Sequence, residues 1–252
     1  MPRTDPGLVP VFEELPAFEE EDLPPPQPAL FERLLLDKRT PAGQQLRLLG
    51  ARLRALGKDR RLRRLGVTSA GVGDGRSSVA LGLAHALAEG HHRRVLLVEV
   101  DLLRPAFDER LACAPPETGL RRYLEDDSDG LVTVRRLGPT GLWMLSAGRG
   151  GPAGLEALAS PGLVPLLKSA DRVFDYTVLD CPPLLPGPEV AALQAQTDGL
   201  VFVVRTRHTK REAVRQAARL LDPARLCGYV LNGQRSRGRP SARGSTTAGR
   251  RR

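Results

Sequence analysis

Residues 65–90 read LGVTSAGVGDGRSSVALGLAHALAEG and decide the fold of this chain. An apolar run, a glycine-rich turn and a helical pattern follow one another, which predicts a buried strand, a tight loop and a helix. Gly71, Gly73 and Gly75 allow successive backbone N–H groups to turn inward at the start of the helix, where the helix dipole also favours an anion. The segment therefore predicts a phosphate-binding loop, and the alternative is an ordinary glycine-rich turn that binds nothing.

The spacing of this loop fits the P-loop pattern when Ala70 takes the first small position and Gly75 the second. Ser77 then stands where a magnesium-binding hydroxyl belongs. Arg76 replaces the expected lysine, and a bulky planar guanidinium is not equivalent to a compact ammonium at a phosphate site. Losing such a donor costs on the order of 3 to 4 kcal/mol in the transition state, so binding can persist while hydrolysis fails. The candidate nucleotide-binding residues of the loop are Gly71, Gly73, Asp74, Gly75, Arg76, Ser77 and Ser78.

Further apolar runs alternate with helix-like segments along the chain, as in parallel strands joined by crossover helices. Most of these runs are continuous rather than alternating, which is typical of strands buried on both faces. The predicted fold class is α/β, a three-layer P-loop NTPase with a mainly parallel central sheet flanked by helices. The predicted strands are residues 65–70, 95–100, 142–148, 176–180, 200–204 and 227–232, and the predicted helices are residues 44–56, 77–89, 188–195 and 210–221.

The two ends of the chain differ in composition from its centre. Residues 1–40 are acidic and proline-rich, which predicts a disordered arm before a P-loop domain over residues 41–234. Residues 235–252 hold seven arginines and no acid, and they are predicted to be a disordered tail. Such a tail can contact an anionic membrane surface or remain solvated. It carries no aromatic residue to stack on bases, so specific nucleic-acid recognition is not expected.

The cysteines and the apolar segments bear on the compartment of the protein. Cys113, Cys181 and Cys227 show no paired spacing, which argues against a disulfide framework or a zinc site. No signal-peptide pattern is present, and no apolar window approaches the roughly 18 residues of a membrane span. We expect a cytoplasmic protein, with peripheral contact at the inner membrane as a further option.

Three segments, in their order along the chain, resemble the tyrosine-kinase modules of bacterial capsule and exopolysaccharide export. The glycine-rich loop is the first segment. The second, VLLVEVDLLRP, resembles an acidic strand end of the family, in which Asp101 matches the second aspartate while Glu99 and Leu103 replace the first aspartate and the arginine. The third, FDYTVLDCPPLLP, resembles the family's Walker B element, and Asp180 matches its acid. The order of the segments also agrees with the wider class of partitioning and division-site ATPases.

The resemblance implies that ATP or ADP binds to the loop with Mg²⁺ held by Ser77, Asp101 and Asp180, partly through water. It makes Asp101 and Asp180 the catalytic candidates and Asn232 the candidate contact to the adenine base. An asparagine at a strand end is about as often only a turn former. The longer side chain of Glu99 is expected to disturb the strict geometry of magnesium.

The chain departs from the kinase pattern in four places. Two of them are Arg76 and the altered acidic strand end. The tail has no tyrosine, because the three tyrosines of the chain lie inside the predicted domain: Tyr123, Tyr176 and Tyr229. The helix before the loop keeps only Arg47 of the three residues by which the family joins subunits into a ring, so a homo-oligomer stays an open expectation.

These departures favour a catalytically impaired nucleotide-binding regulator, a pseudokinase of exopolysaccharide or capsule synthesis and export. Its implied partner is the cytoplasmic end of a membrane polysaccharide co-polymerase. The alternatives are an active protein-tyrosine kinase, a positioning or partitioning ATPase, and a scaffold that binds no ligand.

Overall fold

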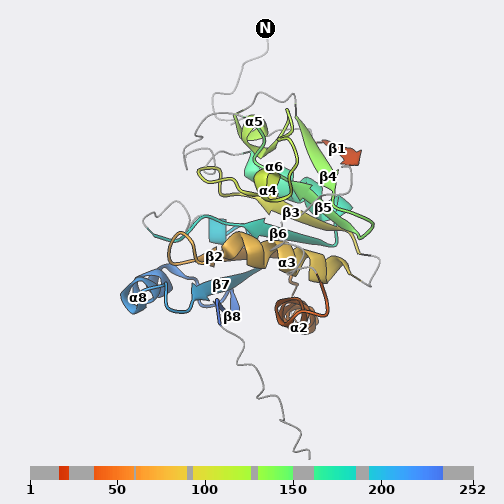
Figure 1. Cartoon of the computed structure of the whole chain (residues 1–252). Coiled ribbons are helices and arrows are strands. Elements are labelled where there is room, and N and C mark those ends of the chain that lie inside the picture. Colours follow the sequence, from red (N-terminus) through yellow and green to blue (C-terminus); the bar gives the residue numbers. More distant parts are fainter. Residues whose placement is uncertain are drawn as a thin grey trace, which may run out of the picture.

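The computed structural model describes residues 17–22, 37–59, 61–89, 93–125, 130–149, 162–185 and 193–234. Their strands form one sheet in the order β1-β4-β5-β3-β6-β2-β7-β8 (Figure 1). Neighbouring strands run parallel except β4 and β5, which run antiparallel. The strands are β1 (Ala17–Asp22), β2 (Arg64–Ser69), β3 (Val95–Glu99), β4 (Leu131–Arg136), β5 (Leu142–Leu145), β6 (Tyr176–Asp180), β7 (Gly199–Arg205) and β8 (Leu226–Asn232). The predicted fold class is confirmed.

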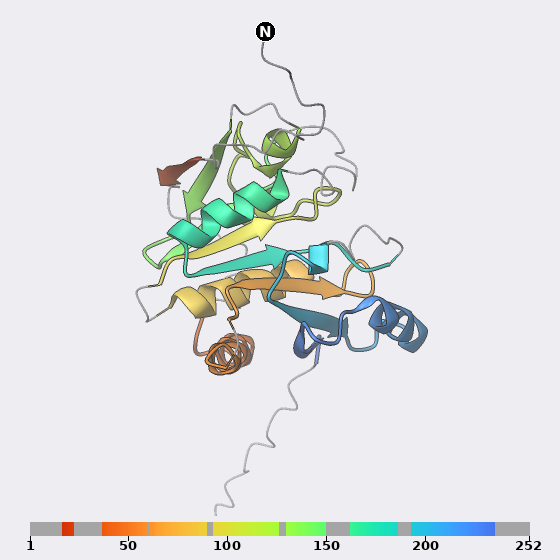
Figure 2. The ribbon, with the colours of Figure 1, turned by 180° about the vertical axis from the view of Figure 1, so that it is seen from behind.

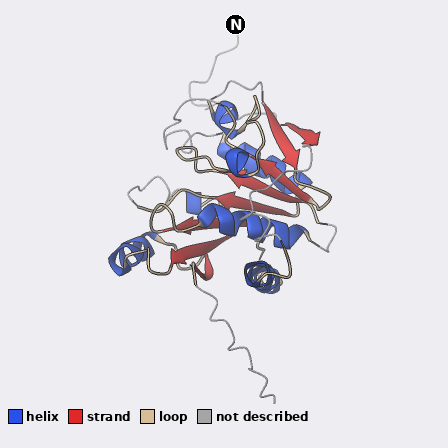
Figure 3. Ribbon diagram, in the orientation of Figure 1, coloured by secondary structure: helices blue, strands red, loops and turns tan. Residues whose placement is uncertain are grey.

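Helices cover both faces of the sheet and complete the three layers (Figure 3). One face packs against α2 (Pro41–Leu56), α3 (Arg76–Ala88) and α4 (Phe107–Arg110). The other face packs against α5 (Leu120–Leu124), α6 (Leu163–Val173) and α8 (Arg211–Leu220), and α6 lies in front of the sheet when the molecule is seen from behind (Figure 2). Successive residues of β3 alternate between the two cores, which explains its unbroken apolar sequence.

Helix α3 runs along the centre of its face of the sheet and is buried on nearly every side. Its apolar sequence follows from this position, because α2 covers the side that the sheet leaves open. Gly82 permits the contact between the two helices, since a Cβ there would lie 2.3 Å from the Leu46 side chain of α2. The packing fixes the N-terminus of α3 at the carboxyl ends of β2, β3 and β6, where parallel α/β sheets bind ligands.

The acidic arm contains a strand that the sequence did not predict. Strand β1 pairs in parallel with β4 at one edge of the sheet. The ring of Phe18 packs edge-on against Phe174 at 5.6 Å between centroids, and Glu21 forms a 2.9 Å ion pair with the buried Arg135. The prediction of disorder through residue 40 is therefore wrong at β1, because apolar packing and ion pairing hold this segment on the sheet.

The remaining boundaries differ in smaller ways. The predicted helix at residue 44 begins at Pro41, since the Thr40 hydroxyl accepts a hydrogen bond from the Gly43 N–H and caps it. The sequence also missed β4 and α6. Residues 1–16 and 23–36 of the arm, the tail 235–252 and most of the predicted helix 188–195 lie outside the described residues. Within the described part, no helix is both long and apolar enough to span a membrane.

Candidate functional site

The glycine-rich loop joins β2 to α3 and takes a conformation that two of its glycines make possible. Gly73 and Gly75 have φ values of +83° and +91°, a region that favours glycine over other residues. Gly71 has an ordinary φ, and a Cβ there would meet nothing within 4 Å. The loop therefore has the turn that a phosphate cradle requires, at the N-terminus of a helix.

The connection between β7 and α8 holds this loop from outside. Arg205 donates from Nη1 to the Gly73 carbonyl at 2.9 Å, and a ring nitrogen of His208 lies 3.2 Å from the Val72 carbonyl. Thr209 donates its hydroxyl proton to the carboxylate of Asp74 at 2.6 Å. The loop is thus fixed by contacts to a neighbouring strand end.

Asp74 and Asn232 organise the loop from within. The buried Asp74 carboxylate also accepts the Gly71 N–H at 3.2 Å, so it spans the turn. The Asn232 side chain donates from Nδ2 to the Asp74 carbonyl at 2.9 Å. This contact places the predicted base-binding residue against the loop backbone, where its amide stabilises the turn. Its role toward a base stays a prediction.

Three acidic side chains lie at the adjoining carboxyl ends of β3 and β6. Glu99 and Asp180 are register partners across the two strands, and the Asp101 N–H donates to the Asp180 carbonyl at 3.1 Å. All three side chains are buried. Three carboxylic acids gathered away from water need either protons or cations nearby.

Arg76 supplies one such cation from within the chain. Its Nη2 lies 2.9 Å from an Asp101 oxygen, and its Nη1 donates to the Cys181 carbonyl directly after β6. The Arg76 side chain is only 7% exposed and that of Asp101 only 4% exposed. The residue predicted to reach a nucleotide phosphate is therefore turned into the acidic cluster, because its long forked side chain can span from the loop to both strand ends.

Asp180 is as deeply buried as Glu99. Burial raises its pKa to about 7, although the Arg76 charge and a hydrogen bond with Ser77 act in the opposite direction. Its Oδ1 atom has no hydrogen-bond partner within the described residues. An oxygen of this kind, beside the Ser77 hydroxyl, matches the hard ligands that magnesium prefers.

The acidic cluster fits Mg²⁺ only in part. Asp180 and Ser77 suit the metal, but the Asp101 carboxylate is already paired with Arg76. Within the described residues, no group of three or more His, Cys, Asp and Glu side chains is arranged to hold a metal ion. The full predicted set therefore requires that Arg76 first leave Asp101.

Glu99 has a structural role that the sequence did not indicate. Its two carboxylate oxygens accept the backbone N–H groups of Phe107 at 2.9 Å, Ala147 at 3.0 Å and Ala106. Burial raises its pKa, and these three hydrogen bonds oppose the shift. Glu99 thus joins the segment after β3 to the end of β5. Its effect on a magnesium-bound water stays a prediction.

The other serine of the loop is engaged as well. The Ser78 hydroxyl accepts a hydrogen bond from Arg110 Nη1 of α4 at 3.0 Å. Arg110, Arg205 and Thr209 were not predicted. The sequence did hold a signal for Arg205 and Thr209. Both lie in the polar run RTRHT, which follows the apolar strand β7, and β7 pairs with β2, the strand that leads into the loop.

Comparisons with known proteins agree with this geometry. No family model matches the chain. The succinoglycan biosynthesis transport protein ExoP of Rhizobium meliloti is 30% identical over 173 residues, which cover 67% of this chain and 22% of ExoP. The tyrosine-protein kinase YwqD of Bacillus subtilis is 27% identical over 194 residues, which cover 76% of this chain and 81% of YwqD. The chain thus spans about a fifth of the length of ExoP but most of YwqD.

Solved structures show the same fold. The BceF tyrosine kinase domain matches with a TM-score of 0.69 and 27% identity, covering 83% of this chain and 91% of that domain. The kinase domain of Escherichia coli tyrosine kinase ETK matches with a TM-score of 0.74 and 23% identity, covering 84% of this chain and 83% of that domain. The septum site-determining protein MinD of Pyrococcus horikoshii, complexed with Mg-ADP, matches with a TM-score of 0.53 and 20% identity, covering 67% of this chain and 69% of MinD.

Proposed function

We propose, from the relationship of this chain to the bacterial tyrosine kinases of capsule and exopolysaccharide synthesis, that it is a nucleotide-binding regulator of that process with impaired phosphoryl transfer. The relatives named above support the pathway, and the P-loop fold of the neighbours supports the ligand. The glycine-rich loop, held in shape by Asp74, Asn232 and Thr209, supports nucleotide binding by this chain.

The ion pair between Arg76 and Asp101 is the observation that carries the proposal of impaired catalysis. Phosphoryl transfer needs a cation on the transferred phosphate and an unpaired acid to order metal and water. Here the loop cation and the acid neutralise each other. Separating such a buried pair leaves an uncompensated charge and is costly, of the order of 3 to 5 kcal/mol when one partner is removed.

The ligands of the proposed site follow from the same residues. ATP or ADP would lie on the backbone of Gly71 to Ser78, and Mg²⁺ would be held by Ser77 and Asp180, with Asp101 available only after Arg76 leaves. When bound, the metal would neutralise phosphate charge. Nucleotide can then act as a structural ligand that shifts the population of a binding-competent state rather than as a substrate.

The proposed setting is the cytoplasmic face of the membrane, in contact with a polysaccharide co-polymerase. ExoP is named as a transport protein of succinoglycan biosynthesis, which supports this class of partner. Arg47, the one retained residue of the ring-forming helix, forms an ion pair with Glu89 of the same chain. That contact lies within one chain and gives no support for a ring.

Calorimetry with ATP and ADP, in magnesium and in a chelator, tests the proposal. We expect the wild type to bind nucleotide and Ser77→Ala to bind it more weakly. Arg76→Lys should release Asp101, strengthen the magnesium dependence and raise ATP turnover by about a hundredfold. Absence of binding by the wild type and by Arg76→Lys would reject a nucleotide site and leave a scaffold.

An active tyrosine kinase is the second candidate, because several relatives carry that name. It predicts that the wild type phosphorylates a tyrosine-bearing partner and that Asp101→Ala abolishes the transfer. That result would replace the regulator proposal. Nucleotide-driven dimerisation without such transfer would instead favour a positioning ATPase.

A further inference from the structure

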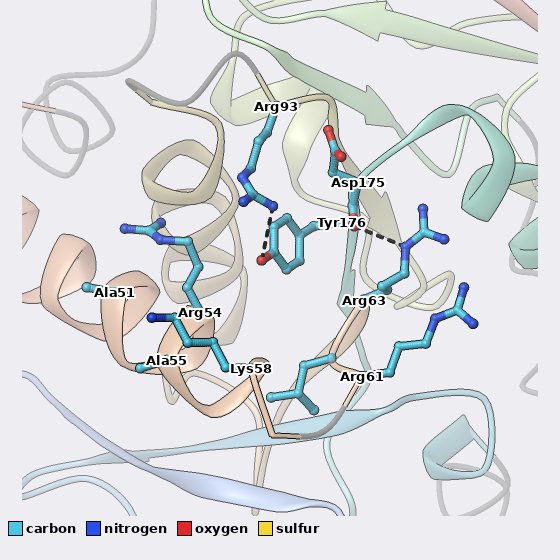
Figure 4. Close-up of a pocket in the computed structure, with 11 residues that line it drawn as sticks. Ala51, Arg54, Ala55, Lys58, Arg61, Arg63, Arg93, Asp175 and Tyr176 are labelled. Atoms are coloured by element: carbon cyan, nitrogen blue, oxygen red, sulfur yellow. Dashed lines mark hydrogen bonds between the residues drawn. The ribbon is translucent and has the colours of Figure 1, made fainter.

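A cavity of about 670 Å³ lies at the amino ends of the central strands, opposite the carboxyl ends that adjoin the glycine-rich loop. Its walls come from the last turn of α2, the segment that enters β2, and the starts of β3 and β6 (Figure 4). Since loop and cavity adjoin opposite ends of the same parallel strands, the two are separate sites. The volume lies within the range of small-molecule pockets, roughly 300 to 1,000 Å³.

The lining of this cavity is strongly basic. One carboxylate, Asp175, is present, and its Oδ2 accepts the Arg94 N–H at 2.8 Å. The cations of the lining are Arg54, Lys58, Arg61, Arg63 and Arg93. Like charges gathered in one concave surface raise the local concentration of anions.

Two of these cations have a structural explanation. Arg63 donates from Nη2 to the carbonyls of Asp171 and Phe174, at 2.6 and 2.7 Å, where α6 ends. Arg54 donates from Nη1 to the Ala86 carbonyl in the last turn of α3 at 3.4 Å. Cations at helix C-termini satisfy carbonyls and stabilise the helix dipole.

The side chains of the other three cations donate to no helix carbonyl among the described residues. Arg93 lies over the Tyr176 ring at 5.4 Å from its centroid, and its Nη1 donates to the Tyr176 hydroxyl at 3.5 Å. Lys58 and Arg61 are exposed, and their head groups form no hydrogen bond or ion pair with the described residues. Figure 4 shows Lys58 and Arg61 on opposite sides of the lining with their head groups turned outward, and Arg93 above Tyr176 between them.

We propose that this cavity binds a phosphate-bearing anion through Lys58, Arg61 and Arg93. Guanidinium groups offer paired donors that match phosphate oxygens, and the ammonium of Lys58 adds a point charge. The Tyr176 hydroxyl accepts from Arg93, and its own proton can be donated to the same ligand. The phosphate comes either from a soluble phosphorylated molecule or from the headgroup of an anionic lipid. The site is independent of nucleotide at the glycine-rich loop.

Calorimetry with inorganic tripolyphosphate tests this site on the full chain. Because the glycine-rich loop also suits polyphosphate, the titration is repeated with Ser77→Ala. We expect Ser77→Ala to retain binding at the basic cavity, and Lys58→Gln combined with Arg61→Gln to weaken that binding by about tenfold. The matched control combines Lys168→Gln with Arg172→Gln, which removes one lysine and one arginine from the exposed side of α6.

Vesicles separate the two sources of phosphate. Co-sedimentation with phosphatidylcholine, alone or mixed with phosphatidylglycerol, is measured for the same variants. If the cavity variant, but not the control variant, loses binding to vesicles, the ligand is a lipid headgroup. If the cavity variant loses binding to tripolyphosphate but not to vesicles, the ligand is a soluble phosphorylated molecule. Equal binding by the cavity variant and the wild type in both assays would overturn the proposal, as would equal losses in the cavity and control variants.

A second measurement avoids substitution altogether. The wild-type chain is acetylated with a limiting amount of reagent, with and without tripolyphosphate. Peptide mass spectrometry then measures how far each lysine is modified. Ligand in the cavity should protect the Lys58 amine at least about fivefold more than the Lys168 amine, because only the former would be in a charge-assisted contact. Equal modification of the two lysines in both conditions would contradict the site.

Discussion

The proposed loss of catalysis depends on a single residue at the end of the glycine-rich loop. Arg76 keeps the positive charge of a P-loop lysine but directs it to Asp101 and the Cys181 carbonyl. A substitution that looks conservative in charge thus changes the partner of that charge. As a result, Arg76 and Asp101 contact each other, and neither is free to contact a ligand.

Gly75 and Gly71 form a matched pair for testing the loop conformation. Gly75→Ala should destabilise the protein by about 2 to 4 kcal/mol, because its φ of +91° is strained for alanine and the new Cβ would lie 2.0 Å from Asn232 Nδ2. Gly71→Ala should change stability by less than about 0.5 kcal/mol. Urea unfolding measures both, and similar losses would show that the loop is not held in this conformation.

Asp180 predicts a pH dependence of stability. Its pKa is raised from 3.8 to about 7 in the folded chain, so the folded state binds a proton more tightly than the unfolded state. The stabilisation that comes from this proton is fully present below the pKa of Asp180 in the unfolded chain. It decreases as pH rises and is lost above the pKa of Asp180 in the folded chain. Between about pH 5 and pH 8 the wild type should lose roughly 3 kcal/mol relative to Asp180→Asn. Parallel urea-unfolding profiles for the two proteins would contradict the assignment.

At the scale of elements, the site is assembled by connections rather than by the strands alone. The β7–α8 connection holds the outside of the glycine-rich loop, and Glu99 joins the segment after β3 to the end of β5. The contacts of Asp74 and Glu99 satisfy carboxylates that would otherwise be buried without partners. The rigid sheet therefore positions the strand ends, and polar side chains fix the loops on them.

Thr209 tests the role of the β7–α8 connection. Thr209→Val keeps the shape of the side chain but removes the hydroxyl that bonds Asp74 and accepts the Arg205 N–H. We expect a stability loss of about 1 to 2 kcal/mol and nucleotide binding weakened severalfold, because the loop is less well ordered before binding. Thermal unfolding and calorimetry measure these effects. Thr140→Val, in the turn between β4 and β5, is the control and should leave nucleotide affinity unchanged.

At the scale of the whole molecule, the sheet extends from the acidic N-terminal segment to the strand that carries Asn232. The phosphate loop lies at one end of the central parallel strands and the basic cavity at the other. The strands between the two sites keep them apart, so the proposed ligands would not compete for the same space. The proposed nucleotide site and the proposed anion site thus lie at opposite ends of the same strands.

Strand β1 gives a prediction for the whole chain. A chain that begins at residue 23 should lose about 2 kcal/mol of stability, because it lacks the Phe18 contact and the Glu21 partner of buried Arg135. It should also associate more readily, since β4 becomes an open edge. A chain that begins at residue 17 keeps β1 and serves as the control. Equal unfolding temperatures and equal sedimentation of the two chains would show that β1 does not stabilise the sheet.

The sequence by itself determined the α/β class, six of the eight strands, and the position of the glycine-rich loop between β2 and α3. These follow from signals that lie within a few residues of one another, such as unbroken apolar runs and glycines at turn positions. Strand β4 and helix α6 were missed, although α6 has a clear helical pattern with Leu163, Leu166, Leu167 and Ala170 buried.

Tertiary structure alone decided which partners the polar residues take. Arg76 meets Asp101 across 25 positions of sequence, and Asn232 meets Asp74 across 158 positions. Strand β1 is stable only because β4, Phe174 and Arg135 lie where its acidic, proline-flanked sequence can pair with them. The physical reason is that hydrogen bonds and ion pairs depend on burial and on ångström-scale distances, which arise only after distant segments pack together.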